Sequence, residues 1–74
     1  MGYKIICLNE KGLVSSIIRG DEYQIEENGR NGIVYEYLIT MYKHSYKRID
    51  DTLFIPNTEL VASSYCSKYT IEEV

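Results

Sequence analysis

The sequence contains no tryptophan, one proline, one histidine and two cysteines. Two cysteines are too few for a disulfide framework. The apolar runs are only a few residues long, far shorter than the roughly 20 residues of a membrane-spanning helix. The first twelve residues, MGYKIICLNEKG, turn polar after Leu8 and lack the basic and then apolar order of a signal peptide. We therefore expect a cytoplasmic protein with reduced thiols and no membrane contact.

The sequence also lacks the residue sets that catalysis and metal binding require. A nucleophile needs a base and a group that orients the base, and His44 is the single histidine. The chain has neither a Gly-x-Ser-x-Gly elbow nor a phosphate-binding glycine loop. Cys7 and Cys66 lack the paired spacing of zinc ligands, and Cys7 lies in an apolar run typical of a small core residue. We expect no enzyme activity, no metal site and no cofactor.

Tyrosine is present in excess, with eight Tyr against one Phe. Tyrosine suits half-buried sheet surfaces and binding faces, because its ring is apolar and its hydroxyl can stay in water. A chain of 74 residues forms one small globular unit, whose core cannot hide every tyrosine. The formal net charge of -3 argues against strong nonspecific binding to nucleic acid. Exposed tyrosines therefore indicate protein contacts.

Short alternating segments separated by turn residues predict an all-β fold. YKIICL, residues 3–8, is rich in β-branched residues and ends in the turn-prone NEKG. After Gly20, Tyr23 and Ile25 alternate with polar residues, which is the period of a strand with one buried face. We interpret residues 19–21, RGD, as a turn into this second strand, and we expect Gly20 to supply a positive φ there.

NGRNG, residues 28–32, is the strongest hairpin signal, and its length predicts a loop of about four or five residues. Residues 33–49 fit either a strand or an amphipathic helix. β-branched and aromatic residues dominate this segment and no capping residue precedes it, which favours a strand. We expect a long strand over residues 33–41, a bend near residues 43–45, and a fourth strand that ends at Ile49.

The C-terminal third contains the single proline. We expect a turn at Asp50-Asp51, a short strand TLFI, and an end to pairing at Pro56, which has no N–H for a ladder. PNTEL, residues 56–60, predicts a single helical turn that tucks Leu60 into the core. Residues 61–74 alternate in part and predict an extra strand or a tail that orders on a partner. We therefore divide the chain into a barrel over residues 1–60 and a C-terminal extension over residues 61–74.

Five short strands and one helical turn in this order describe a small SH3-like barrel. KIICLNEKG, SSIIRGDEYQIEE and TLFIPNTEL resemble, in this order, short phage and prophage proteins with SH3-like barrels and unassigned function. The spacing Gly20-x-x-Tyr23-x-Ile25 and the segment FIP, residues 54–56, match best, and the likeness covers most of residues 3–60. The resemblance implies an SH3-like fold and a phage origin in a bacterial host cell. It carries over no catalytic residue.

Two clusters supply candidate binding residues. YKHSYKR, residues 42–48, suits stacking on bases and contact with phosphates. The same pattern also fits a solvated segment whose charges discourage edge-to-edge association. Acidic residues in the first half of the chain suit a rim that faces a basic partner, or an ordinary solvated surface. The candidate partner-binding residues are Tyr35, Tyr37, Tyr42, Lys43, Tyr46, Lys47, Arg48, Glu10, Asp21 and Glu22.

We expect a non-enzymatic binding module, encoded by a phage or prophage, that docks on a host or phage protein. Docking would modulate the activity of that protein, and one form of this hypothesis is inhibition of a host defence protein. One alternative is nucleic-acid binding through residues 42–48. The other is a structural or oligomer-forming role in a virus particle. Whether Cys7 and Cys66 approach each other is left open by the sequence.

Overall fold

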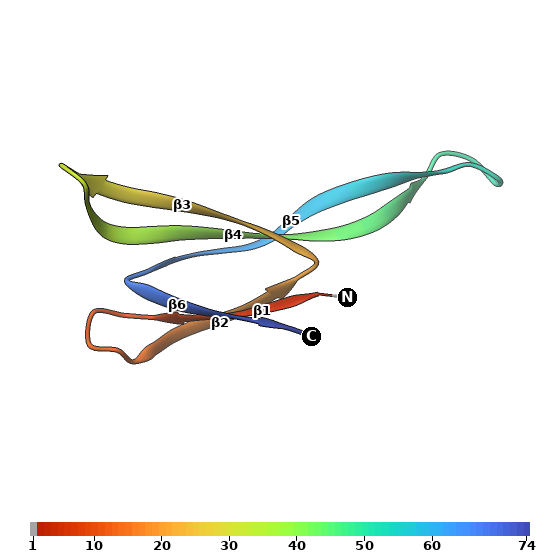
Figure 1. The fold of residues 1–74 in the computed structure, drawn as a ribbon. Coiled ribbons are helices and arrows are strands. Elements are labelled where there is room, and N and C mark those ends of the chain that lie inside the picture. The colour runs from red at the N-terminus through yellow and green to blue at the C-terminus, as the bar shows by residue number, and fades with distance from the viewer. Residues whose placement is uncertain (1) are drawn as a thin grey trace.

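The computed structural model describes residues 2–74 and contains six antiparallel strands. They are β1 (Tyr3–Leu8), β2 (Val14–Gly20), β3 (Glu22–Arg30), β4 (Ile33–Arg48), β5 (Phe54–Cys66) and β6 (Lys68–Glu73). They form two three-stranded sheets with the orders β2-β1-β6 and β3-β4-β5 (Figure 1). The predicted all-β class is confirmed. The strands form two small sheets rather than one five-stranded sheet, so a five-stranded SH3-like barrel is not confirmed.

Two long stretches of chain pass from one sheet to the other. β2 continues into β3 through Asp21, and β5 continues into β6 through Ser67. The Asp21 N–H donates to the Tyr42 carbonyl oxygen at 2.8 Å, and the Ser67 N–H donates to the Leu8 carbonyl oxygen at 2.9 Å. Hydrogen bonding to the neighbouring strand therefore continues through both corners. Bent strands that switch sheets are a known way to make such corners.

Gly20 is required by a close approach and not by its φ. A Cβ at Gly20 would collide with the Met41 side chain and would lie 2.7 Å from the Tyr42 carbonyl oxygen. Among residues 2–74, positive φ occurs at Gly12, Asn31 and Gly32. The predicted turn over residues 19–21 is wrong in its bounds, because Arg19 and Gly20 belong to β2 and the chain bends only at Asp21. The expectation of a positive φ at Gly20 is wrong.

The β3–β4 hairpin closes on two residues, Asn31 and Gly32, with φ of 55° and 77°. Two consecutive residues with positive φ suit a type I′ turn, whose twist matches that of the flanking strands. The hairpin is confirmed, but the predicted loop length is wrong. The first Asn-Gly pair belongs to β3, where the pairing register shifts between Asn28 and Gly29.

Residues 33–48 form a single strand, which confirms the strand interpretation over the helix. The expected bend near residues 43–45 and the separate fourth strand are wrong, because β5 pairs with β4 continuously from Tyr37 to Arg48. The one irregularity lies between Met41 and Tyr42, where Val61 is the extra residue on β5. A bulge of this kind increases the local twist without ending the strand.

The predicted helical turn over residues 56–60 is wrong, because these residues belong to β5. Pairing does not stop at Pro56, which lies opposite Tyr46. β5 is an edge strand of its sheet, and an edge tolerates proline where the missing N–H faces away from the neighbouring strand. Leu60 is exposed and does not enter the core.

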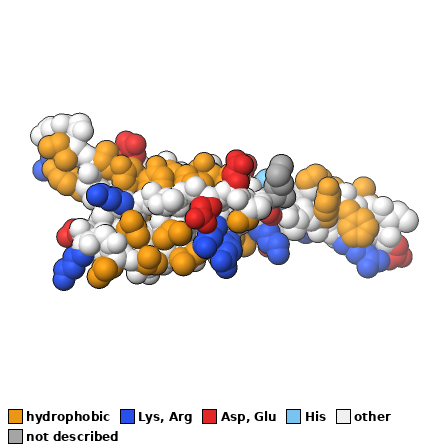
Figure 2. Space-filling model, turned by 60° about the horizontal axis from the view of Figure 1, so that its bottom comes forward, with side chains coloured by type: hydrophobic (Ala, Val, Ile, Leu, Met, Phe, Trp, Pro, Cys, Tyr) orange, Lys and Arg blue, Asp and Glu red, His pale blue; other side chains and the backbone are white. Residues whose placement is uncertain are grey.

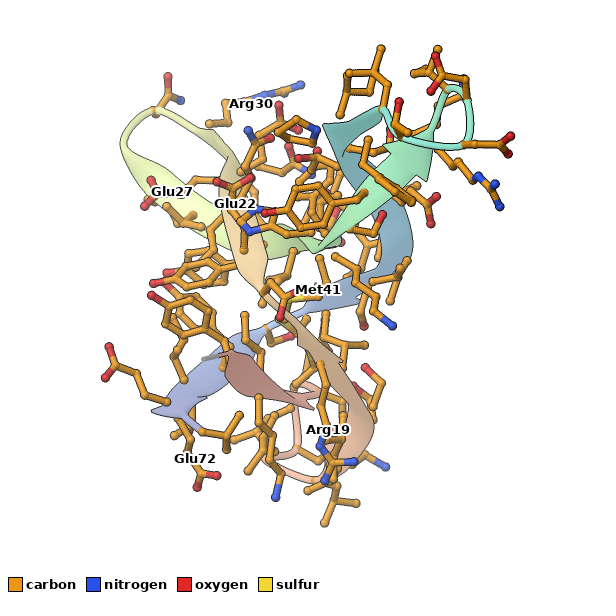
Figure 3. The ribbon with its side chains drawn as sticks, turned by 90° about the vertical axis from the view of Figure 1, so that its right-hand side faces the viewer. Arg19, Glu22, Glu27, Arg30, Met41 and Glu72 are labelled. Atoms are coloured by element: carbon orange, nitrogen blue, oxygen red, sulfur yellow. The ribbon has the colours of Figure 1, made fainter. Side chains whose placement is uncertain are left out.

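The core is small and lies where the two sheets overlap. Figure 3 shows Met41 between the sheets, with Arg19 and Glu72 on the β2-β1-β6 side. Two pairs of tyrosine rings, Tyr3 with Tyr23 and Tyr37 with Tyr69, meet edge to face with centroids 4.9 and 5.0 Å apart. The buried side chains are Ile5, Cys7, Ile18, Ile39, Met41 and Cys66.

Residues 61–74 form the second half of β5 together with β6. β6 pairs along the whole of β1, from Tyr3 opposite Glu73 to Leu8 opposite Lys68. Cys66 is buried in the core and Ile71 packs against it. The extra C-terminal strand is confirmed. The division of the chain at residue 60 stays a prediction about which part folds alone.

Candidate functional site

The distal parts of β4 and β5 form a two-stranded ribbon that projects beyond the rest of the molecule (Figure 1). Pairing of β3 with β4 ends at Glu22 opposite Tyr42, whereas pairing of β4 with β5 continues to Arg48 opposite Phe54. The ribbon helps to make the molecule long, at 51 × 26 × 16 Å. We call residues 43–60 the arm. A two-stranded ribbon is only marginally stable on its own in water, so contacts at its root and tip matter.

Asp50 orders the tip of the arm. Its Oδ1 atom accepts hydrogen bonds from the backbone N–H groups of Thr52 at 2.8 Å and Leu53 at 2.9 Å. These two backbone donors, followed by the Thr52 hydroxyl, lower the pKa of Asp50 because they favour its ionised form. The Arg48 guanidinium donates to the carboxylate of Asp51. The predicted turn at Asp50-Asp51 is confirmed.

Asp21 holds the root of the arm. Its Oδ2 atom accepts a hydrogen bond from the His44 backbone N–H at 2.8 Å, next to the bond from its own N–H to Tyr42. The Glu22 carboxylate lies 3.8 Å from His44 Nε2. The Asp21 carboxylate therefore bonds to the His44 N–H in the place of a strand that would continue the pairing of β3 with β4. The ladder on this side of β4 ends there.

The two faces of the arm differ, because directly opposed residues of antiparallel strands point to the same face. On the outer face Tyr46 lies opposite Pro56, and Arg48 lies opposite Phe54. Tyr46 is 74% exposed, Leu60 is 62% exposed and Phe54 is 53% exposed. Figure 2 shows hydrophobic side chains gathered on the narrow projecting end of the molecule. The outer face consists of His44, Tyr46, Arg48, Phe54, Pro56, Thr58 and Leu60.

The basic side chains of the arm are divided between its faces. The inner face of the arm is the face opposite the outer one, on the same side of β4 as Met41. Lys43, Ser45 and Lys47 point to this inner face, because alternate strand residues point to opposite sides. Lys43 lies opposite Glu59, and Arg48 on the outer face bonds to Asp51. Within residues 43–60 the cations therefore do not line up as one continuous strip on either face.

The structure brings together seven of the ten predicted binding residues and separates three. Tyr35 is exposed near the β3–β4 turn, and at about 3.3 Å per residue it lies roughly 36 Å along β4 from Tyr46. Tyr37 is half-buried against Tyr69, and Glu10 lies in the β1–β2 loop, at the opposite end of β2 from Asp21. The residues gathered at the arm and its root are Tyr42, Lys43, Tyr46, Lys47, Arg48, Asp21 and Glu22.

Phe54, Pro56 and Leu60 are surface residues that were not among the predicted binding residues: Phe54 was expected in a short strand, and Pro56 and Leu60 in a helical turn. The Asp50-Asp51 turn could have predicted their position, because a turn sets which residues of the two flanking strands lie opposite each other. Counting outwards from a loop over residues 49–53 aligns Arg48 with Phe54 and Tyr46 with Pro56, as the structure has them. This alignment puts one aromatic ring from each strand on the same face.

The two cysteines are neighbours across the core, one on β1 and one on β5. Burial, together with the adjacent Cys7 thiol, raises the pKa of Cys66 to about 12. Burial also raises the pKa of Tyr69, and the nearby Tyr37 adds to this shift. The Cys66 thiol is therefore protonated at neutral pH, and a protonated buried thiol is a poor nucleophile and metal ligand.

No group of three or more His, Cys, Asp or Glu side chains in residues 2–74 is placed to hold a metal ion. The same residues include no helix with the length and apolar character needed to cross a membrane.

Comparisons with protein-family models, with curated proteins and with solved structures each return no match.

Proposed function

We propose that this protein is a non-enzymatic binding module that docks on another protein through the arm. The observation that carries the proposal is the exposure of Tyr46, Phe54 and Leu60 on one face of a projecting ribbon. At about 200 Å² per aromatic side chain, the two aromatic residues alone expose roughly 250 Å². Patches of a few hundred Å² often mark interaction sites, and tyrosine is enriched among residues that dominate binding energy.

The SH3-like barrel and the phage or prophage origin belong to the same proposal. Two bent strand pairs that link the sheets, β2–β3 and β5–β6, support a barrel-like reading of the fold. The partner is then a protein of the bacterial host or of the phage, met in the cytoplasm. Docking modulates its activity, and inhibition of a defence protein is the form that fits a phage accessory protein.

Nucleic-acid binding through residues 42–48 is the weaker candidate. Affinity for nucleic acid depends on several cations that reach phosphates together. Lys43 and Lys47 point to one face of the arm, and Arg48 points to the other, where it bonds to Asp51. A protein partner needs no such continuous basic surface.

Site-specific photo-crosslinking tests the proposal directly. A photoreactive phenylalanine analogue replaces Tyr46 in one version and Tyr35 in the control version, because both positions are exposed and lie at opposite parts of β4. We expect irradiation in a bacterial cell to join one host protein to position 46 and not to position 35. The same adducts from both positions would contradict the proposal.

The purified crosslinked protein then serves as the partner in a binding measurement. The double substitution Phe54→Ser and Leu60→Ser should lower affinity at least tenfold, because both side chains lie on the outer face. The exposed Leu13→Ser substitution, in the β1–β2 loop, is the matched control and should leave affinity unchanged. Equal affinity of the double variant and the wild type would refute docking through the arm.

A further inference from the structure

The backbone of β4 has an open edge in the arm. In an antiparallel strand, successive residues direct their N–H and C=O groups to opposite neighbours. Tyr42 and His44 bond toward the β3 side, where Asp21 is their partner. The Ile49 N–H bonds toward β5, to the Leu53 carbonyl oxygen. Tyr46 and Arg48 therefore direct their backbone groups to the β3 side, beyond the point where β3 has ended.

Five polar backbone groups lie along this open edge. They are the His44 C=O and the N–H and C=O groups of Tyr46 and Arg48. No strand formed by residues 2–74 pairs with them, since the pairing of β3 stops at Tyr42. All three residues are exposed. An unpaired row of donors and acceptors is a template for another strand.

The other long edge of the arm is blocked. Odd-numbered residues of β5, such as Asn57 opposite Ser45, face β4. By alternation, Phe54, Pro56 and Thr58 direct their backbone groups outwards. Pro56 has no N–H, so the centre of this edge lacks a donor, which is a common protection of edge strands. Only the β4 edge of the arm is therefore competent to accept a strand over several residues.

Charge indicates what kind of strand fits. A strand added beside β4 brings its side chains within about 5 Å of those on β4, on both faces. The basic β4 side chains that flank the open edge are Lys43, Lys47 and Arg48, of which Arg48 already bonds to Asp51 and Lys43 lies opposite Glu59 on β5. No carboxylate lies on β4 between residues 43 and 48. Acidic side chains on the incoming strand would therefore meet cations, whereas basic ones would meet like charge.

We propose that the β4 edge over residues 44–48 accepts an extended acidic segment of the partner protein as an added strand, a step that rests on the proposed function above. The added strand lies in line with β3, beyond Asp21, and the exposed ring of Tyr46 covers one side of it. Strand addition of this type draws affinity from backbone hydrogen bonds and specificity from alternate side chains. A second copy of this chain fits less well, because it would bring the Lys and Arg side chains of one β4 edge beside those of the other, with no carboxylate on either β4 segment over residues 43–48.

The first experiment uses two labelled peptides with the full chain. The acidic probe has the sequence TEVEVEVT and the matched basic probe has the sequence TKVKVKVT. We expect fluorescence anisotropy to show binding of the acidic probe, weakened by salt, and at least tenfold weaker binding of the basic probe. In amide hydrogen exchange, the acidic probe should slow exchange of the Tyr46 and Arg48 N–H groups tenfold or more.

Proline substitutions separate the backbone from the side chain. Tyr46→Pro removes the central donor of the open edge and should weaken the acidic probe at least tenfold. Tyr46→Val keeps the N–H and loses only the ring, so it should weaken the acidic probe less than Tyr46→Pro does. Thr58→Pro removes a donor from the opposite edge, so it should stay within threefold of the wild type. If Tyr46→Pro unfolds the arm, the test is amide exchange in the wild-type protein: slowed exchange at Tyr46 and Arg48 with the acidic probe supports strand addition, and unchanged exchange contradicts it.

Three results would overturn the inference. They are equal binding of the two probes, slowed exchange at Thr58 and Leu60 instead of Tyr46 and Arg48, and exchange at Tyr46 that slows with protein concentration without any probe. The last result would identify a second copy as the occupant. If the crosslinked partner tolerates Tyr46→Pro but not the Phe54→Ser and Leu60→Ser double substitution, strand addition fails while docking through the arm stands.

Discussion

The corner between β2 and β3 offers a quantitative test of the fold through Gly20 and Met41. A methyl group at Gly20 would meet Met41 Cγ, Met41 Sδ and the Tyr42 carbonyl oxygen, all closer than real Cβ atoms come to such neighbours. Two of the three colliding atoms belong to the side chain of Met41, which is fully buried. Gly20→Ala should therefore destabilise the protein by about 2–3 kcal/mol, as overpacking does.

Met41→Ala should cost about 3 kcal/mol or more, because it empties part of a core of six buried side chains. In the double variant, the methyl group of Ala at position 20 occupies space that Met41 leaves. The contact with Tyr42, at 2.7 Å, is the one that remains. The two substitutions should therefore be less costly together than their sum by about 1–2 kcal/mol, a coupling typical of residues in contact.

Urea unfolding at neutral pH, followed by tyrosine fluorescence, measures the four free energies of unfolding. Gly12→Ala is the control for the cycle. Its φ is positive, so the substitution is strained, but no heavy atom lies within 4 Å of the added Cβ. Gly12→Ala and Met41→Ala should thus be additive within about 0.5 kcal/mol. Additivity of Gly20→Ala with Met41→Ala would refute the close approach and the corner built on it.

Three further predictions concern pH and chain length. The folded protein favours the protonated Cys66 thiol. The free energy of unfolding should therefore be constant below about pH 9 and fall as pH rises toward 12, by up to about 1.4 kcal/mol per pH unit. Urea midpoints at pH 8 and pH 10 measure this fall, and Cys66→Ala should reduce it. The pKa of Asp50 is lowered, so its contribution to the tip should be lost as pH drops through that value, and faster exchange of the Leu53 N–H relative to the Ile5 N–H would show this. Deleting residues 61–74 removes β6 from β1 and Cys66 from the core, so the shortened chain should lose its cooperative urea transition; a folded 1–60 fragment would instead establish the division at residue 60.

Much of the secondary structure was predictable because its signals are local. Alternation around Tyr23 and Ile25 places one face of β3 on the core, and Asn31-Gly32 suits a two-residue turn through positive φ. The aromatic and β-branched residues of the segment that begins at Ile33 correctly favoured a strand. The loop length of the β3–β4 hairpin was wrong, and the larger errors, at residues 43–45 and 56–60, lie where a distant partner decides. PNTEL has the local features of a helical turn, but the long β4 strand pairs with it and holds it extended.

The candidate site was predictable only in part, for the same reason. Residues 42–48 stand out in the sequence because they combine basic and aromatic side chains. Leu60 was assigned to the core and Phe54 to a short strand, because an apolar residue near a proline carries no local mark of exposure. Tyr35 and Glu10 resemble the site residues in chemistry but lie far from the arm.

The sequence by itself determined the all-β class, the first strand and the hairpin between β3 and β4, since side-chain period and turn-forming residues act between near neighbours. Only the tertiary structure decided that Asp21 ends the ladder at His44, that Pro56 lies on a free edge, and that the opposite edge of β4 is open. These features follow from which strands pair and where each pairing stops. Backbone groups are alike in every residue, so the choice of pairing strands depends on the packing of the whole fold.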